Sequence, residues 1–118
     1  MARLIWQATN KRGEDTENQT CQALEMLKNE GKIRGFYRVK KWSRQDRRNI
    51  DAVVFLNDNS KVFCQIKSSL RGVKECQEEL KKFDTRDIVI LYGRYLPNET
   101  PGQYKERIFR EITKILSH

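Results

Sequence analysis

Two short apolar segments separated by a turn sequence constrain the fold of this chain more than any other feature. Residues 51–56 read DAVVFL, residues 61–67 read KVFCQIK, and the NDNS between them has turn chemistry. Their β-branched and aromatic content predicts two strands joined as a hairpin. Because side chains alternate along a strand, an apolar set and a mixed set should lie on opposite faces. The apolar set is Val62, Cys64 and Ile66, and the mixed set is Phe63, Gln65 and Lys67.

The length of the connecting loop decides which residues of the two strands face each other. A two-residue turn would pair Asp51 with Ile66, whereas a three-residue loop at 58–60 would pair Asp51 with Lys67. An odd loop, or a bulge near Asp51, places Asp51 on the face of Gln65 and Lys67. The same register gives both strands one common apolar face, so we expect an odd loop or a bulge.

Periodicity predicts further elements on both sides of the hairpin. Helices are expected at 14–30, 72–83 and 103–116, and strands at 35–42 and 87–92. The opening MARLIWQATN is expected to be a short strand or an arm. A helix between the third and fourth strands implies a crossover, so part of the sheet should be parallel. We therefore expect one α/β domain over residues 1–118, a mixed central sheet flanked by helices in the order α-β-β-β-α-β-α.

Charge and cysteine content narrow the function classes. The 118 residues carry 24 Lys and Arg against 16 Asp and Glu, a net charge of +8, which favours a polyanionic partner. The odd, unclustered set Cys21, Cys64 and Cys76 argues against a disulfide scaffold or a zinc site and suits reduced thiols in a cytoplasmic protein. Since no segment has the apolar run of a signal peptide or membrane span, no membrane association is expected.

The chemistry is predicted from the stretch NIDAVVFLNDNSKVFCQIKSS at 49–69. Asp51 heads one strand, and Gln65 and Lys67 lie on the neighbouring strand. Phosphodiester hydrolysis needs a divalent ion held by oxygens, an activated water and positive charge near the pentavalent phosphate. Because Mg²⁺ takes only one or two protein carboxylates and keeps several waters, an acid, an amide oxygen and a lysine can supply these needs.

This stretch resembles the PD-(D/E)XK nuclease superfamily, which includes restriction endonucleases and Holliday-junction resolvases. Asp51 after Ile50 stands where Pro–Asp would, and Gln65–Ile66–Lys67 stands where (Asp/Glu)-x-Lys would. The glutamine is similar to the Q-x-K variant of Mrr-type restriction enzymes. The resemblance, which covers roughly residues 14–93, implies an endonuclease dependent on Mg²⁺ or Mn²⁺, with DNA favoured over RNA.

The resemblance also implies roles for individual residues. Asp51 and a glutamate of the first helix would hold the metal, helped by the Gln65 side-chain oxygen and the Ile66 carbonyl. Glu17 is the chosen glutamate because it extends the inward face of that helix, and Glu14, one turn earlier, is the reserve. Lys67 would orient or activate the water and offset phosphate charge. Each residue also has a purely structural alternative. Asp51 could simply be an acid at the start of a strand, and Gln65 a hydrogen-bonded amide of the sheet. Glu17 could be an acid at the helix N-terminus, and Lys67 a solvated lysine.

A basic segment leads directly into Asp51, and it comprises Arg38, Lys40, Lys41, Arg44, Arg47 and Arg48 with Trp42 among them. Its members predicted to bind nucleic acid are Lys41, Trp42, Arg44, Arg47 and Arg48. Basic side chains would bind phosphates and the indole could stack on a base, although a solvated loop is the plain alternative.

Two other functions stay open at this point. One is a nuclease-like module that has lost catalysis, as Gln65 suggests, and that holds nucleic acid or a protein partner. The other is a basic protein-interaction domain. A homodimer is attractive for the enzyme, because cutting both strands with one small site usually needs two copies.

Overall fold

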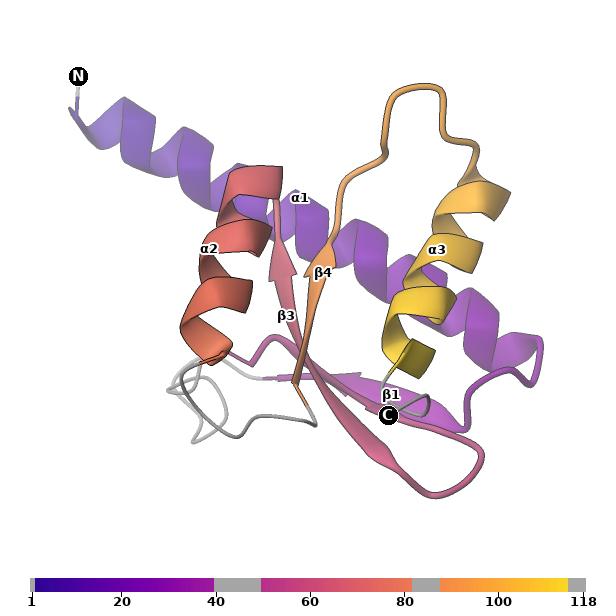
Figure 1. Ribbon diagram of the computed structural model, residues 1–118. Helices are drawn as coiled ribbons and strands as arrows, with labels where there is room; N and C mark the ends of the chain where they lie inside the picture. Colours follow the sequence, from indigo (N-terminus) through magenta and orange to yellow (C-terminus); the bar gives the residue numbers. More distant parts are fainter. Residues whose placement is uncertain (1, 40–49, 82–87, 115–118) are drawn as a thin grey trace.

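The computed structural model describes residues 2–39, 50–81 and 88–114, with side chains from Glu14 onward. Figure 1 shows the arrangement of the helices and strands. In chain order they are α1 (Ala2–Asn29), β1 (Gly35–Arg38), β2 (Ala52–Phe55), β3 (Lys61–Lys67), α2 (Leu70–Leu80), β4 (Ile88–Tyr92) and α3 (Pro101–Thr113). The predicted α/β class and the order α-β-β-β-α-β-α are thereby confirmed.

The four strands form one mixed sheet in the order β1-β2-β3-β4. β1 and β2 pair antiparallel, as do β2 and β3, whereas β3 and β4 pair parallel. Helix α2 connects β3 to the parallel strand β4, and this connection is the predicted crossover. β4 lies at a sheet edge but is contacted by both α2 and α3, which accounts for its nearly all-apolar sequence IVILY.

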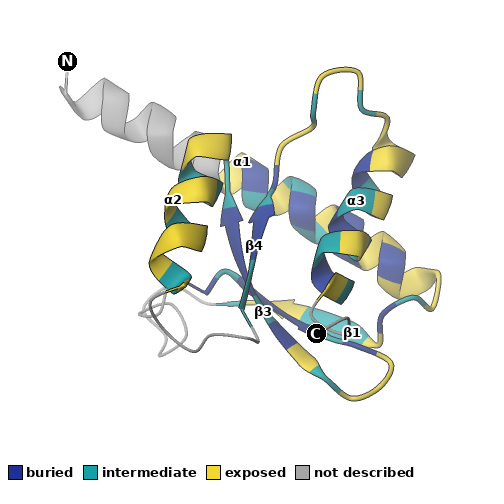
Figure 2. Cartoon of the chain, viewed as in Figure 1, coloured by how far each residue is buried: buried dark blue, intermediate teal, exposed yellow. Residues whose placement is uncertain are grey.

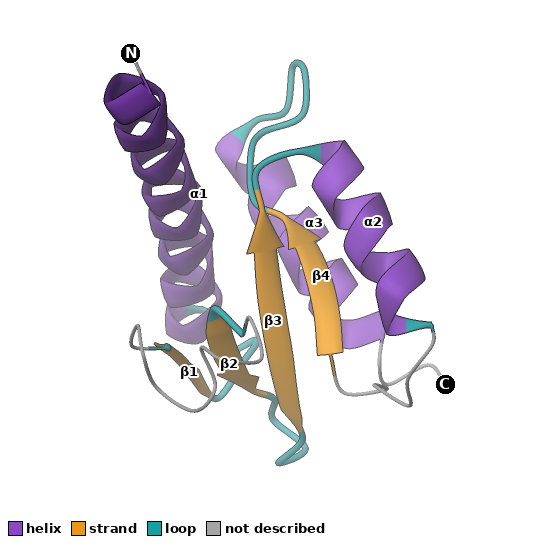
Figure 3. Ribbon diagram, turned by 90° about the vertical axis from the view of Figure 1, so that its left-hand side faces the viewer, coloured by secondary structure: helices purple, strands orange, loops and turns teal. Residues whose placement is uncertain are grey.

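The main core lies between the sheet and the helices α1 and α3. Its strand positions include the predicted apolar set, and Figure 2 shows buried positions running along β3 and β4. The buried cluster comprises Ala23, Leu24, Leu27, Ile33, Ala52, Val54, Leu56, Val62, Cys64, Ile66, Leu91, Tyr104, Ile108 and Ile112. Helix α2 covers the other side with no fully buried residue, and Figure 3 shows the sheet between α1 and α2.

Between β2 and β3, Leu56 and Ser60 continue the pairing and leave a three-residue loop at 57–59. The Leu56 N–H donates to the Ser60 carbonyl at 2.9 Å, and Asn59 takes the left-handed conformation (φ 73°) usual in such loops. The odd loop is therefore confirmed, but it spans 57–59 rather than 58–60. Consequently Ala52 faces Cys64, not Ile66, and the predicted pairing of Asp51 with Lys67 is wrong. A shift of two residues keeps the paired side chains of β2 and β3 on their predicted faces.

Helix α1 differs most from the sequence prediction. It begins at Ala2, so the expected strand or arm at the N-terminus is wrong. Once a packed segment nucleates a helix, each further residue adds a hydrogen bond at small entropic cost, and no proline interrupts residues 2–13. The helix ends at Asn29, one residue before the predicted end at 30. Gly31 (φ 75°) follows it, and its N–H donates to the Lys28 carbonyl while the Lys32 N–H donates to the Leu27 carbonyl. None of the described helices combines the length and apolar character needed to cross a membrane.

Candidate active site

Asp51 lies where the pairing between β2 and β3 becomes irregular. Its N–H donates to the Cys64 carbonyl at 2.8 Å, and Cys64 is also the partner of Ala52. Two residues thus face one, which is the arrangement of the β-bulge expected near Asp51. The Asp51 carboxylate accepts a 2.7 Å hydrogen bond at Oδ2 from the Ile66 N–H. The carboxylate is therefore held beside the third strand by a backbone donor.

Helix α1 brings a second carboxylate to the same place. The side chain of Glu17 is 27% exposed, and its Oε2 pairs with Nη2 of Arg38 at 2.8 Å. The Glu17 carboxyl group is close enough to that of Asp51 to raise the pKa of Asp51, both by its charge and by a side-chain hydrogen bond. Glu14, the reserve choice, lies exposed one turn earlier. Of the two candidate glutamates, Glu17 is therefore the one beside Asp51.

The environment of Asp51 makes its ionised form unfavourable. Burial raises the pKa of Asp51 to about 6, and the charge of Glu17 adds to the rise. The Ile66 N–H and the charge of Lys67 act in the opposite direction. A divalent cation bound between the two carboxylates would favour both of them in the ionised form.

Strand β3 supplies the remaining predicted residues. Lys67 is half-buried and close enough to lower the pKa of Asp51. Because the N–H and C=O of a strand residue point to the same neighbouring strand, the Ile66 carbonyl is directed to the side from which Asp51 approaches. The Gln65 side chain is only 6% exposed and alternates with Ile66, so it points to the face that α2 covers. Metal ligation by Gln65 stays a prediction.

Close packing at Gly93 holds α1 against the end of β3. A Cβ atom at Gly93 would lie 2.5 Å from Thr16 Cγ2, 2.7 Å from Ile66 Cγ2 and 2.7 Å from Thr20 Oγ1. The Gly93 N–H also donates to the Lys67 carbonyl at 2.9 Å. Sequence reasoning missed this residue, although a glycine directly after an apolar strand signals close approach of another backbone or helix.

Ser69, Asp58 and the cysteines have structural roles. The Ser69 hydroxyl caps α2 by accepting the Gly72 N–H at 3.0 Å. Asp58 accepts the Ser60 N–H at 2.9 Å within the hairpin loop. All three cysteines are free, and burial raises the pKa of Cys64 to about 12. These side chains therefore serve the fold rather than the chemistry.

The predicted nucleic-acid-binding residues lie outside the described part of the chain. They are Lys41, Trp42, Arg44, Arg47 and Arg48. The residues on either side of this segment are held in the fold. The Val39 N–H donates to the Asp51 carbonyl at 3.0 Å, and Ile50 is buried. The basic segment therefore leaves and rejoins the fold beside Asp51.

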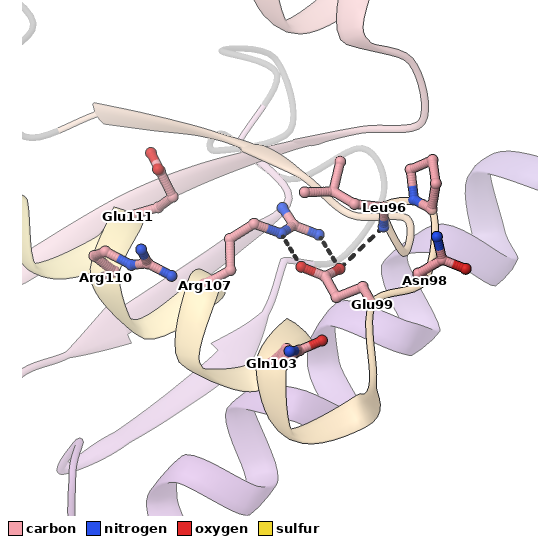
Figure 4. Close-up of a pocket in the computed structure, with 8 residues that line it drawn as sticks. Leu96, Asn98, Glu99, Gln103, Arg107, Arg110 and Glu111 are labelled. Atoms are coloured by element: carbon pink, nitrogen blue, oxygen red, sulfur yellow. Dashed lines mark hydrogen bonds and ion pairs between the residues drawn. The ribbon is translucent and has the colours of Figure 1, made fainter.

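A pocket of about 600 Å³ lies elsewhere, between α3 and the chain that follows β4. Figure 4 shows Arg107 and Glu99 pointing toward each other in it. Arg107 pairs with Glu99 at 2.8 Å and donates to the carbonyls of Tyr92 and Arg94 at 2.8 and 2.7 Å. Since this guanidinium is used to hold residues 92–99 in place, we assign the pocket a structural role.

The donor set at Asp51 and Glu17 suits a hard divalent cation. Among the residues that the structure describes, no three His, Cys, Asp or Glu side chains are grouped for metal binding. Two carboxylates with a backbone carbonyl and waters match the preference of Mg²⁺, whereas structural zinc takes four Cys or His ligands. The residues present therefore fit the ion that the sequence predicts.

Comparison of the chain with family models, curated proteins and solved structures finds no match. The residues and their geometry are therefore the basis for the function proposed below.

Proposed function

We propose that this protein is a metal-dependent endonuclease that hydrolyses phosphodiester bonds in nucleic acid, with DNA favoured as the substrate. The observation that carries the proposal is the meeting of Glu17 and Asp51, 34 positions apart in sequence, beside Lys67. Two like charges this close are unfavourable unless a proton or a cation joins them. The resemblance of this stretch to PD-(D/E)XK nucleases supports the same chemistry.

In this proposal each residue has a distinct role. Glu17, Asp51 and the Ile66 carbonyl would hold Mg²⁺ or Mn²⁺, with the Gln65 amide oxygen as a further predicted ligand. A bound divalent ion supplies a Lewis acid and lowers the pKa of its water. Lys67 orients the attacking water and offsets the charge that develops on the phosphate. The Ile66 N–H keeps the Asp51 carboxylate in one orientation.

The basic segment supports a polyanionic substrate. By sequence, residues 40–49 contain five Lys and Arg and one Asp. Because this segment joins the fold beside Asp51, its charge adds to the local attraction for phosphates. The preference for DNA and the use of two copies to cut both strands are further parts of the proposal.

The decisive experiment is a cleavage assay on plasmid, linear, branched and single-stranded substrates, with and without Mg²⁺ or Mn²⁺. We expect divalent-ion-dependent nicking by the parent and loss of cleavage in Asp51→Ala. Asp58→Ala is the matched control, because Asp58 is an acid of the same hairpin that lies in its loop. If Asp51→Ala cuts as fast as the parent, the assignment of the site is wrong.

One observation favours a second candidate function. Gln65 is neutral where the commonest form of the motif has an acid, and its side chain is buried. A module that binds nucleic acid without cutting it would fit this change. Salt-dependent retention of DNA, without cleavage of any substrate at any divalent-ion concentration, would support that function over the nuclease.

A further inference from the structure

We propose that Arg38 is a substrate-binding residue, whose guanidinium binds a phosphate oxygen of the nucleic-acid backbone beside the bond that is cut. This inference rests on the proposed nuclease function and extends it to how the substrate is held. By sequence, Lys67 is predicted to face the phosphate, whereas Arg38 is only one member of a basic run.

The position of Arg38 brings its guanidinium to the carboxylate pair. Arg38 is the last residue of β1 and pairs with Ala52, which follows Asp51 in the chain. Its Nη2 lies 2.8 Å from Glu17 Oε2, and its Nη1 donates to Asn18 Oδ1 at 2.5 Å. The side chain is 39% exposed. The guanidinium therefore lies between β1 and α1, at the solvent side of Glu17.

The charges of the site indicate what Arg38 can do there. Arg38 pairs with Glu17, and the charge of Lys67 acts on Asp51, so two cations offset two carboxylates. When a divalent cation is held by the carboxylates, the same group of side chains carries an excess positive charge that an anion can balance. The backbone phosphate is that anion, and a guanidinium presents paired N–H donors that match two phosphate oxygens.

A purely structural ion pair is a weaker explanation of this contact. Arg38 and Glu17 are both partly exposed, and ion pairs of that kind contribute about 0–1 kcal/mol to stability. Arg71 pairs with Glu75 within α2, whereas Lys32 and Lys105 form pairs between α3 and the residues that follow α1, away from the candidate site. Arg38 instead joins the edge strand to the helix that carries the candidate metal ligand, which places it where substrate would approach.

The test compares Arg38→Gln with Arg34→Gln. Arg34 is the matched control because it precedes the same strand, is exposed, and bonds to Asn59 of the hairpin loop at the other end. Affinity for a short DNA duplex is measured by fluorescence anisotropy across a salt series, once with EDTA and once with Ca²⁺. We expect Arg38→Gln to weaken binding in Ca²⁺ by about tenfold and to reduce the salt slope by about one phosphate contact. Arg34→Gln should leave both values near those of the parent.

A second variant separates charge from hydrogen-bond geometry. Arg38→Lys should restore the salt slope but only part of the affinity, because lysine is a point charge without the guanidinium fork. Thermal melting of each variant checks folding, and we expect shifts of no more than a few degrees. Equal binding by Arg38→Gln and Arg34→Gln would overturn the inference, and so would full recovery of affinity by Arg38→Lys.

The two proposals fail in different ways in this experiment. If the parent binds the duplex and Arg38→Gln weakens it, but no protein cuts DNA with Mg²⁺, the nuclease proposal fails while the phosphate contact stands. If the parent cuts DNA and the two glutamine variants bind equally, only the Arg38 inference fails. If the parent does not bind the duplex under any condition, both are wrong.

Discussion

The Tyr104 hydroxyl donates a 2.6 Å hydrogen bond to the Gly93 carbonyl, directly after β4. The same hydroxyl lies 3.1 Å from the Thr20 hydroxyl of α1, which in turn donates to the Thr16 carbonyl at 3.1 Å. One oxygen of α3 therefore connects the end of the parallel strands to the turn of α1 that carries Glu17. This network contributes to the position of Glu17, a candidate metal ligand, although none of its own groups is one.

Replacing Tyr104 by Phe should lower the free energy of unfolding by about 1–3 kcal/mol. The change removes the partner of the Gly93 carbonyl in a buried position, and an unpaired buried carbonyl is unfavourable. Tyr95→Phe is the control, since Tyr95 is 40% exposed and contacts the Tyr104 ring at 4.5 Å between centroids. Urea unfolding of the three proteins measures the effect, and an equal loss in both variants would contradict the role of the buried hydroxyl.

Replacing Gly93 by Ala should disturb α1 against β3. The new methyl would lie within 2.7 Å of Thr16, Ile66 and Thr20, so the helix must shift or the side chains must move. We expect a loss of stability of about 1–3 kcal/mol and weaker Mg²⁺ binding in a calorimetric titration. Gly102→Ala is the control, because nothing lies within 4 Å of a Cβ atom there. A Gly93→Ala protein as stable as the parent would show that the close approach is not restrictive.

Replacing Asp51 by Asn should stabilise the metal-free protein near pH 7. The folded-state pKa of Asp51, about 6, lies above its ordinary value of 3.8. The unfolded state therefore loses its proton first, and stability falls as pH rises from about 4 to about 6. The Asp51→Asn substitution removes this dependence and should raise the free energy of unfolding at pH 7 by about 1–3 kcal/mol. Urea unfolding in EDTA at pH 4.5 and pH 7 measures the effect.

Asp58→Asn should change the free energy of unfolding in the opposite direction from Asp51→Asn, so it serves as the control. The Ser60 N–H lowers the pKa of Asp58, so its ionised form favours the folded state and its loss should not stabilise the protein at pH 7. If Asp51→Asn and Asp58→Asn change stability in the same direction at pH 7, the unfavourable environment assigned to Asp51 is wrong.

Substitutions of Gln65 distinguish the proposed nuclease from a module that only binds nucleic acid. As a metal ligand it contributes a neutral oxygen, so Gln65→Glu should tighten Mg²⁺ binding and lower the concentration needed for half-maximal activity. It need not raise the maximal rate, because Lys67 would then have a stronger ion-pair partner. Gln65→Ala should weaken Mg²⁺ binding without unfolding the domain. If calorimetry gives the same Mg²⁺ affinity for all three proteins, Gln65 is a hydrogen-bonded amide of the sheet and not a metal ligand.

The basic segment is tested by replacing Arg44, Arg47 and Arg48 together with Gln. We expect weaker DNA binding and a flatter dependence of log affinity on log salt, since each lost phosphate contact releases fewer counterions. Replacing Arg71, Lys74 and Lys81 by Gln is the charge-matched control, because these exposed residues lie on or directly after α2. An unchanged salt slope in the Arg44, Arg47 and Arg48 variant would place the phosphate contacts elsewhere.

Local patterns in the sequence were sufficient for the faces of the hairpin and for the order of the elements. The set Val62, Cys64 and Ile66 is buried as predicted, because side chains alternate between the two faces of a strand and these three share the face of the main core. The first helix ends at Asn29, within one residue of its predicted end, and Gly31 after it takes the left-handed conformation that suits glycine. In both cases the requirement acts on neighbouring residues, so neighbouring residues reveal it.

Only the tertiary structure decided the register of β2 on β3, the meeting of Glu17 with Asp51, and the contact of Gly93 with α1. Loops at 57–59 and 58–60 differ by two residues in pairing but present the same faces, so the apolar pattern does not distinguish them. The carboxylate pair depends on where α1 crosses the sheet, and that position depends on side chains from α1, β3, β4 and α3 packing at once. Periodicity along a chain specifies which face is buried, but not which residue of another element lies against it.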